Sequence, residues 1–105
     1  MTTNRIEQLQ KFYEADPGDP FNIYALAIEY LNGAPLQSLS LFEKLLTEHK
    51  TYLPTYYHAA KLYQELGQHD KAVAVYEEGL ALARSQNNPK AQRELQSAYD
   101  EMMFE

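Results

Sequence analysis

The sequence predicts an all-α fold built from six short helices that pack as antiparallel pairs. Apolar residues recur at spacings of three and four along most of the 105 residues, which is the period of an amphipathic helix. The prolines and three of the four glycines fall between these periodic stretches. No segment alternates strictly enough between apolar and polar residues to indicate a strand. Because the breaks are very short, neighbouring helices are expected to run antiparallel.

The positions of the prolines indicate where the helices begin. Proline is favoured at the first helical position because an amide hydrogen there would have no partner within the helix. Every proline falls where a helix could begin: Pro17, Pro20, Pro35, Pro54 and Pro89. Asp19 and Asn88 are good N-cap residues, and Asp70 is expected to cap the helix that follows it. The predicted helices span residues 3–15, 20–32, 35–49, 54–66, 69–85 and 89–103.

Two stretches of the chain match each other at a separation near 34 residues. The pairs at that separation are Pro20 and Pro54, Gly33 and Gly67, Phe42 and Tyr76, and Leu46 and Leu80. A second group, Tyr24, Ala27 and Tyr30, matches Tyr57, Ala60 and Tyr63 at a separation of 33. Self-similarity at this period is typical of proteins built from stacked supersecondary units. In this sequence the predicted unit is a pair of helices.

The second stretch resembles the tetratricopeptide repeat family, whose repeats are antiparallel helix pairs. The residues that carry the resemblance are Tyr56, Ala59, Ala60, Tyr63, Gly67, Ala72, Tyr76, Gly79 and Leu80. The first stretch matches less well, since Leu45 stands where the family has a small residue. In the second stretch, Arg84 stands where the family has a proline after the second helix.

The resemblance implies one domain, residues 1–105, stacked as a short right-handed superhelix. Residues 1–19 resemble the second half of a preceding repeat, residues 20–53 and 54–88 are the two repeats, and residues 89–105 are a closing helix. An unrelated six-helix bundle is the alternative.

Gly79 lies inside the apolar pattern of helix 69–85, where glycine costs roughly 1 kcal/mol relative to alanine. Stacked helix pairs need small residues where one backbone crosses another closely. The resemblance places Ala60, Ala72 and Gly79 at such crossings. We therefore expect a close packing partner for Gly79, the alternative being a glycine tolerated on an exposed face.

Charge and composition limit the classes of partner. Nine lysines and arginines stand against fifteen carboxylates, so the net charge is −6 and the sequence pI is about 5.0. We expect such a chain to bind neither nucleic acids nor anionic membranes, because proteins bind both through basic residues. Without cysteine there is no disulfide or thiolate metal site. The absence of an apolar signal peptide or membrane-spanning run completes the prediction of an acidic, soluble protein of the cytoplasm.

The sequence shows no sign of catalysis. The three histidines are 9 and 11 residues apart, whereas a helical metal pair needs a spacing of three or four. The carboxylate pairs Glu77–Glu78 and Asp100–Glu101 are adjacent in sequence, so they are interpreted as solvated faces. Phosphate-binding glycine loops, serine elbows and cysteine nucleophiles are all missing. We expect no enzyme activity, no metal and no cofactor.

Helix 20–32 is apolar around most of its circumference. One stripe, Ile23, Leu26, Ala27 and Tyr30, is assigned by the repeat to packing within the helix pair. A second stripe, Tyr24, Ile28 and Leu31, is matched on the next repeat by Tyr57, Lys61 and Gln64. In the family, the first helix of each pair lines a concave groove that holds peptides. These six residues are therefore the candidate contacts for an apolar or aromatic peptide segment.

The second stripe has three interpretations: exposure in a groove, burial under the flanking helices, or an interface between two copies of the chain. The chaperone-binding members of the family grip an acidic C-terminal tail with a basic clamp. Here Tyr24 and Ile28 stand on the corresponding face and only Lys61 is cationic, so such tails are not predicted ligands. The predicted function is a non-catalytic protein–protein interaction module, with a self-associating structural subunit as the alternative.

Overall fold

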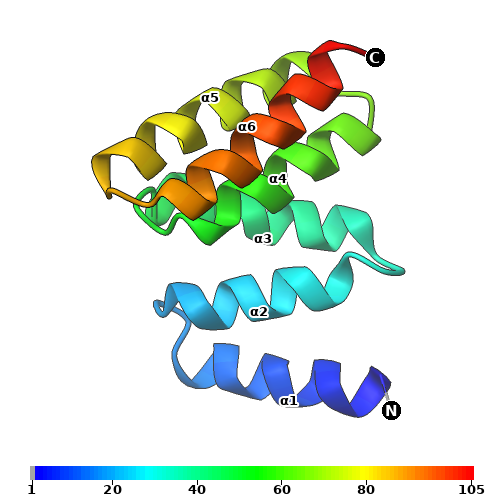
Figure 1. Ribbon diagram of the computed structural model, residues 1–105. Helices are drawn as coiled ribbons and strands as arrows, with labels where there is room; N and C mark the ends of the chain where they lie inside the picture. Colours follow the sequence, from blue (N-terminus) through cyan, green and yellow to red (C-terminus); the bar gives the residue numbers. More distant parts are fainter. Residues whose placement is uncertain (1) are drawn as a thin grey trace. The chain divides into compact units, whose positions relative to one another are not determined.

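The computed structural model describes residues 2–105, with side chains from Arg5 onward, and all of its regular structure is helical (Figure 1). It divides into two compact units, which meet in the sequence at residues 52 and 53. The first unit contains α1 (Thr2–Ala15), α2 (Pro20–Tyr30) and α3 (Pro35–Glu48). The second contains α4 (Pro54–Glu65), α5 (His69–Ser85) and α6 (Pro89–Met103). The predicted all-α repeat fold is confirmed, and each predicted helix end lies within two residues of the observed one.

Local capping explains most of the helix starts. Pro20, Pro35, Pro54 and Pro89 all lie in the first turn of a helix. The Asp19 carboxylate accepts from the Phe21 amide at 2.9 Å, and the Asn88 side chain accepts from the Ala91 amide at 3.0 Å, as predicted.

Two of the predicted starting signals are wrong. Pro17 lies in the turn between α1 and α2, because the amide of Asp19 bonds back to the Asp16 carbonyl and the helix begins only after Asp19. Asp70 does not cap α5, since that helix already begins at His69 and Asp70 lies within its first turn.

The ends of α4 and α5 share one geometry, which keeps the turns of unit 2 short. Gly67 has a positive φ of 78°, and the following amide, of Gln68, returns to the Tyr63 carbonyl at 2.8 Å. Asn87 has a φ of 53°, and the amide after it bonds to the Ala83 carbonyl at 2.9 Å. This is the Schellman arrangement, in which glycine or asparagine takes the left-handed conformation and satisfies the last carbonyls.

In unit 1, α2 ends two residues earlier than predicted. The amide of Leu31 donates to the Ile28 carbonyl at 3.2 Å, so it does not continue the α-helical bond to Ala27. The Ala27 carbonyl instead accepts from the Ser38 hydroxyl of α3 at 2.6 Å. Both residues are fully buried. The Ser38 hydrogen bond therefore connects α2 and α3. It also gives the Ala27 carbonyl a partner in place of the Leu31 amide, which bonds to Ile28 where α2 ends.

Replacing Ser38 with alanine is expected to destabilise unit 1. The Ala27 carbonyl would be buried without its partner, which costs about 1–3 kcal/mol of the free energy of unfolding. Urea denaturation followed by circular dichroism measures this loss. Ser40→Ala is the matched control, because Ser40 lies on the exposed side of the same helix. Equal stabilities for the two variants would contradict the proposed role of the Ser38 bond.

The first apolar stripe of α2 is buried at Ile23, Leu26 and Ala27, as predicted. Tyr30, the fourth member, is only half-buried. It lies at the last residue of α2, and its hydroxyl accepts from the Gln10 side chain of α1 at 3.0 Å. The assignment of Tyr30 to the interior of the helix pair is thus corrected to a contact with the preceding helix.

Gly79 lies where α5 crosses its neighbours in unit 2. A Cβ atom added there would be 2.7 Å from the Cβ of Tyr56 on α4 and 3.3 Å from Cδ1 of Leu95 on α6. Real Cβ atoms essentially never approach another atom as closely as the first of these distances. The expected close crossing is confirmed, and the alternative of an exposed, merely tolerated glycine is wrong.

Candidate interaction surface

The six predicted contact residues form two stripes, one in each unit. Tyr24 and Ile28 lie on α2 and Leu31 directly follows it, whereas Tyr57, Lys61 and Gln64 lie on α4. Spacings of four and three place the three members of each stripe on one side of their own helix. All six side chains are half-buried.

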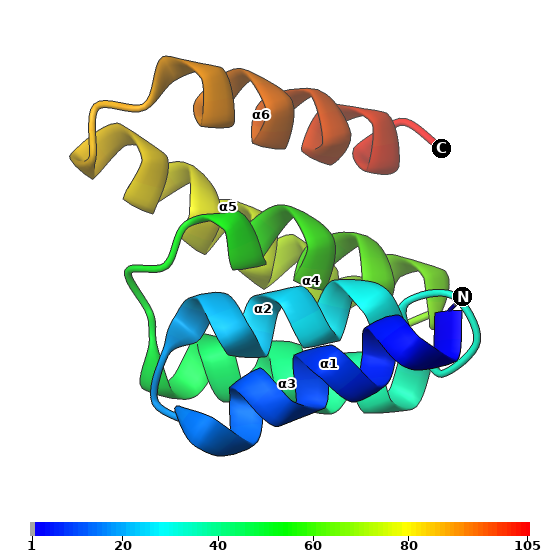
Figure 2. The same ribbon diagram turned by 90° about the horizontal axis from the view of Figure 1, so that it is seen from below.

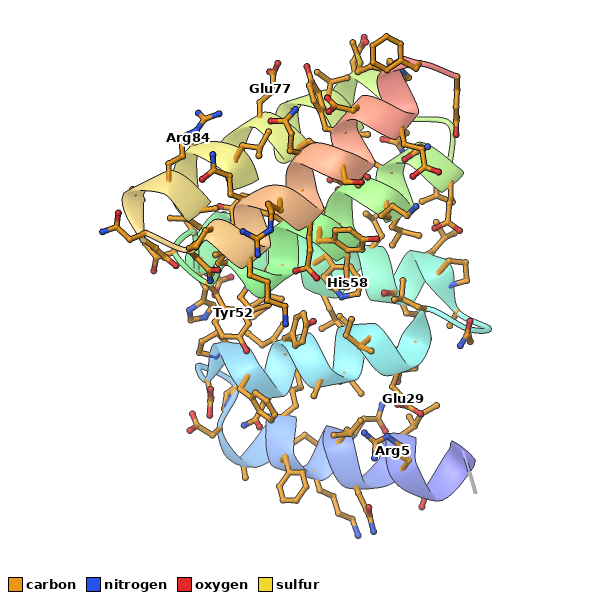
Figure 3. The ribbon with its side chains drawn as sticks, in the orientation of Figure 1. Arg5, Glu29, Tyr52, His58, Glu77 and Arg84 are labelled. Carbon is orange, nitrogen blue, oxygen red and sulfur yellow. The ribbon has the colours of Figure 1, made fainter. Side chains whose placement is uncertain are left out.

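The stripe of unit 1 is extended by a tyrosine from outside the helices. The rings of Tyr24 and Tyr52 meet edge to face, with centroids 5.7 Å apart. Tyr52 lies near the start of α2 (Figure 3). Burial is the main cause that raises the pKa of Tyr24, and the charge of an ionised Tyr52 adds to it. Burial is likewise the main cause that raises the pKa of Tyr52, and the negative charge of Asp19 adds to it. Both hydroxyl groups therefore stay neutral near pH 7 and keep a proton to donate.

An ion pair joins α1 and α2 at the surface of unit 1. Nε of Arg5 lies 2.9 Å from Oε2 of Glu29, and the two side chains point toward each other in Figure 3. Exposed pairs of this kind contribute at most about 1 kcal/mol. The Arg5 guanidinium therefore balances the negative charge of Glu29, the residue that directly follows Ile28 in the sequence.

In unit 2 the α4 stripe continues onto α5 and α6. The hydroxyl of Tyr76 on α5 donates a long hydrogen bond of 3.5 Å to Oε1 of Gln64. The ring of Tyr76 meets the ring of Tyr99 on α6 edge to face, with centroids 6.0 Å apart. The hydroxyl of Tyr99 in turn donates to Oε2 of Glu77 at 3.1 Å. One set of contacts thus joins all three helices of the unit.

Acidic side chains contribute to the raised pKa values of these two tyrosines. Burial raises the pKa of Tyr76 to about 12, with smaller contributions from Tyr57, Glu101 and Glu65. The hydrogen bond to Glu77 is the largest of the effects that raise the pKa of Tyr99. We call Gln64, Glu65, Tyr76, Glu77, Tyr99 and Glu101 the carboxylate–tyrosine cluster. Within this cluster the Tyr76 side chain is fully buried, while the other five side chains are at least partly exposed.

Sequence reasoning missed Tyr99, Glu77 and Glu101 as parts of this surface. A signal for Tyr99 was present: it follows Gln64 by 35 residues, as Pro89 follows Pro54, so α6 presents Tyr99 where α4 presents Gln64. Glu77 is exposed, as the interpretation of a solvated pair required, but it also accepts the bond from Tyr99. No sequence pattern indicates that bond.

Other kinds of site find little support in the structure. Across residues 2–105, no three histidine, aspartate or glutamate side chains converge to hold a metal ion. His58 is half-buried beside the Tyr57 ring, at 5.3 Å between centroids, and burial lowers its pKa. None of the helices described combines the length and the hydropathy that crossing a membrane requires.

Comparison with known proteins places this geometry in a family. Residues 53–86 match the family model described as tetratricopeptide repeat. A tetratricopeptide repeat domain protein from Salinibacter ruber, in a crystal structure, is 40% identical, with 81% of this chain and 96% of that chain covered and a TM-score of 0.78.

A solution NMR structure of a tetratricopeptide repeat domain protein from the same organism is 41% identical, with 83% and 89% covered and a TM-score of 0.78. The crystal structure of MamA is 17% identical, with 97% of this chain and 67% of that chain covered and a TM-score of 0.69, which is a likeness of fold alone. No curated protein matches the sequence. On the similarity to the Salinibacter proteins, the chain belongs to the tetratricopeptide repeat family.

Proposed function

We propose that this chain is a non-catalytic interaction module that binds a peptide or helical segment of another protein. Its contacts would be Tyr24, Ile28 and Leu31 in unit 1 and Tyr57, Lys61 and Gln64 in unit 2. Repeat proteins of this kind use their stacked helices as binding surfaces. We place the module in the cytoplasm, since a chain without cysteine needs no oxidising compartment.

One observation carries the proposal: the aromatic and aliphatic side chains Tyr24, Ile28 and Leu31 remain half-exposed in a regular row along α2. On α4, Tyr57 is likewise half-exposed, in a row with the polar Lys61 and Gln64. A residue needed only for the core would be buried, as Ile23 and Leu26 are on the other side of α2. Tyrosine suits a binding surface because its ring offers apolar area while its hydroxyl group still forms hydrogen bonds. Tyr24 and Tyr57 combine both properties.

The double variant Ile28→Asp with Tyr57→Ala is expected to abolish capture of a partner from a cell lysate. A carboxylate at position 28 would oppose an apolar ligand, and the alanine removes an aromatic contact. Affinity capture followed by mass spectrometry measures the loss, and circular dichroism checks that helicity is unchanged. The matched control is Leu36→Asp with Phe21→Ala, which alters two side chains that are 71% and 61% exposed elsewhere in unit 1. Capture that survives the first double variant would refute these contacts.

The alternative, a self-associating subunit, uses the same apolar stripe of helix 20–32. Ile28 and Leu31 are half-buried, which leaves apolar area that a second copy could cover. Sedimentation across a hundredfold range of concentration separates the two functions. A peptide-binding module stays monomeric over this range, whereas a subunit that joins through the stripe becomes dimeric as the concentration rises.

A further inference from the structure

We infer that the turn between α2 and α3 is a site of spontaneous covalent modification, at which Asn32 loses its side-chain nitrogen as ammonia and becomes aspartate or isoaspartate. The reacting groups are the Asn32 side chain, the Gly33 backbone nitrogen and water. The inference goes beyond the proposed function and does not depend on it.

The turn leaves both reacting residues open to water. Asn32 and Gly33 are exposed, and their turn lies at the right-hand edge of unit 1 in Figures 1 and 2. Within residues 2–105, the Gly33 amide donates no hydrogen bond and the Asn32 side chain forms none. Gly33 has a φ of 115°, and a Cβ built on it would meet no atom within 4 Å beyond its chain neighbours. The nitrogen that follows Asn32 is therefore neither bonded nor covered.

The reaction joins the Asn32 side chain to the backbone that follows it. Hydroxide removes the proton of the Gly33 amide, and the nitrogen forms a bond to Cγ of Asn32. The bond from Cγ to the side-chain nitrogen breaks, and that nitrogen takes a proton from water and leaves as ammonia. Water then opens the cyclic imide at one of its two carbonyls, which gives aspartate or isoaspartate. The net change is asparagine plus water to aspartate plus ammonia, so no oxidant or reductant is needed.

Glycine after the asparagine favours this attack, because it has no side chain to shield the nitrogen and its backbone is the least restricted. Of the five asparagines in the chain, only Asn32 precedes a glycine. Hydrogen bonds protect two of the others. The amide after Asn22 donates to the Asp19 carbonyl at 3.3 Å, and the Asn22 side chain itself donates to two backbone carbonyls. The amide after Asn87 donates to the Ala83 carbonyl at 2.9 Å.

The remaining two asparagines are protected by the residue that follows them. Asn88 precedes Pro89, whose nitrogen carries no hydrogen and cannot be deprotonated. Asn4 precedes Arg5, whose side chain hinders attack by its backbone nitrogen. The modification is therefore confined to Asn32.

Both products change the end of α2, directly after Leu31. Each adds a negative charge to a chain whose net charge is already −6, at the end of a helix where the partial charge is also negative. Isoaspartate also adds a methylene group to the backbone of the turn. The Ala34 amide closes this turn by donating to the Tyr30 carbonyl at 3.0 Å, so the longer backbone disturbs that bond.

Ageing of the full chain in mildly alkaline buffer, followed by tandem mass spectrometry, tests the inference. We expect Asn32 alone to show the rise in mass that replacement of NH2 by OH produces. The product should separate into two forms, one of which an isoaspartyl methyltransferase labels. Because the Gly33 amide reacts without unfolding, Asn32 should react in the folded chain at a rate within about tenfold of its rate in urea.

Asn32→Gln is the matched variant, since its longer side chain would have to close a larger and less favourable ring. It should give no labelled product at position 32 and leave the other asparagines as they are in the unaltered chain. An Asn32 that reacts in urea but stays intact in the folded chain would overturn the inference, as would modification that falls mainly on another asparagine. The comparison with urea uses the unaltered chain, so the test stands even if the variant folds poorly.

Discussion

Replacing Phe42 with alanine is expected to lower the free energy of unfolding by about 3–5 kcal/mol. The Phe42 ring on α3 is fully buried, so the change removes apolar contacts and leaves a cavity that the surrounding helices fill only in part. Phe42 also stands 34 residues before Tyr76, the fully buried aromatic of α5. The prediction therefore tests whether the less regular first repeat depends on its aromatic residue as a packed repeat should.

Urea denaturation measured by circular dichroism gives the loss of stability. Phe12→Ala is the control, because Phe12 belongs to the same unit but is 60% exposed, and its replacement should change stability by no more than about 0.5 kcal/mol. A Phe42→Ala variant as stable as the Phe12→Ala variant would show that the buried ring contributes no packing.

Gly79→Leu is expected to cost about 1–3 kcal/mol, because it forces extra atoms into a well-packed crossing. Gly79→Ala is the more informative change. In an isolated helix it would stabilise by roughly 1 kcal/mol. Here the new Cβ would lie 2.7 Å from the Cβ of Tyr56, an atom attached directly to the α4 backbone that cannot rotate away. We therefore expect alanine to destabilise the protein as well, against the helix propensity.

The thermal midpoints of the two Gly79 variants provide the measurement. Gly18→Ala is the control, since no atom lies within 4 Å of the position that its Cβ would take. That variant should have a midpoint equal to or above that of the unaltered chain. A midpoint raised by Gly79→Ala would mean that α4 and α5 move apart at little cost.

Much of the local structure could be predicted because its causes are local. Proline at the first helical turn and the caps at Asp19 and Asn88 act within a few residues, so the sequence indicates these boundaries directly. The errors were of the same kind. Proline is found in turns as well as at the first position of a helix, and aspartate is found in the first turn as well as at the N-cap. The hydrogen bonds at the observed helix starts place Pro17 in the turn and Asp70 in the first turn of α5.

The candidate site could be predicted only in part. The repeat period places Tyr57, Lys61 and Gln64 on one side of α4, since a helix fixes which side chains share a face. It does not say which groups of α5 and α6 that face meets. The bonds from Tyr76 to Gln64 and from Tyr99 to Glu77 join residues on different helices, 12 and 22 positions apart.

The sequence by itself determined six helices, their order and the repeat that relates the two pairs. These depend on apolar spacing, caps and turns, which are properties of short segments. Only the tertiary structure decided that Ser38 supplies the bond that Ala27 lacks, that Gly79 has no room for a Cβ, and that Tyr99 of α6 donates a hydrogen bond to Glu77 of α5. The reason is physical: such contacts depend on how closely and at what angle two helices cross, and the side chains of both helices determine this together.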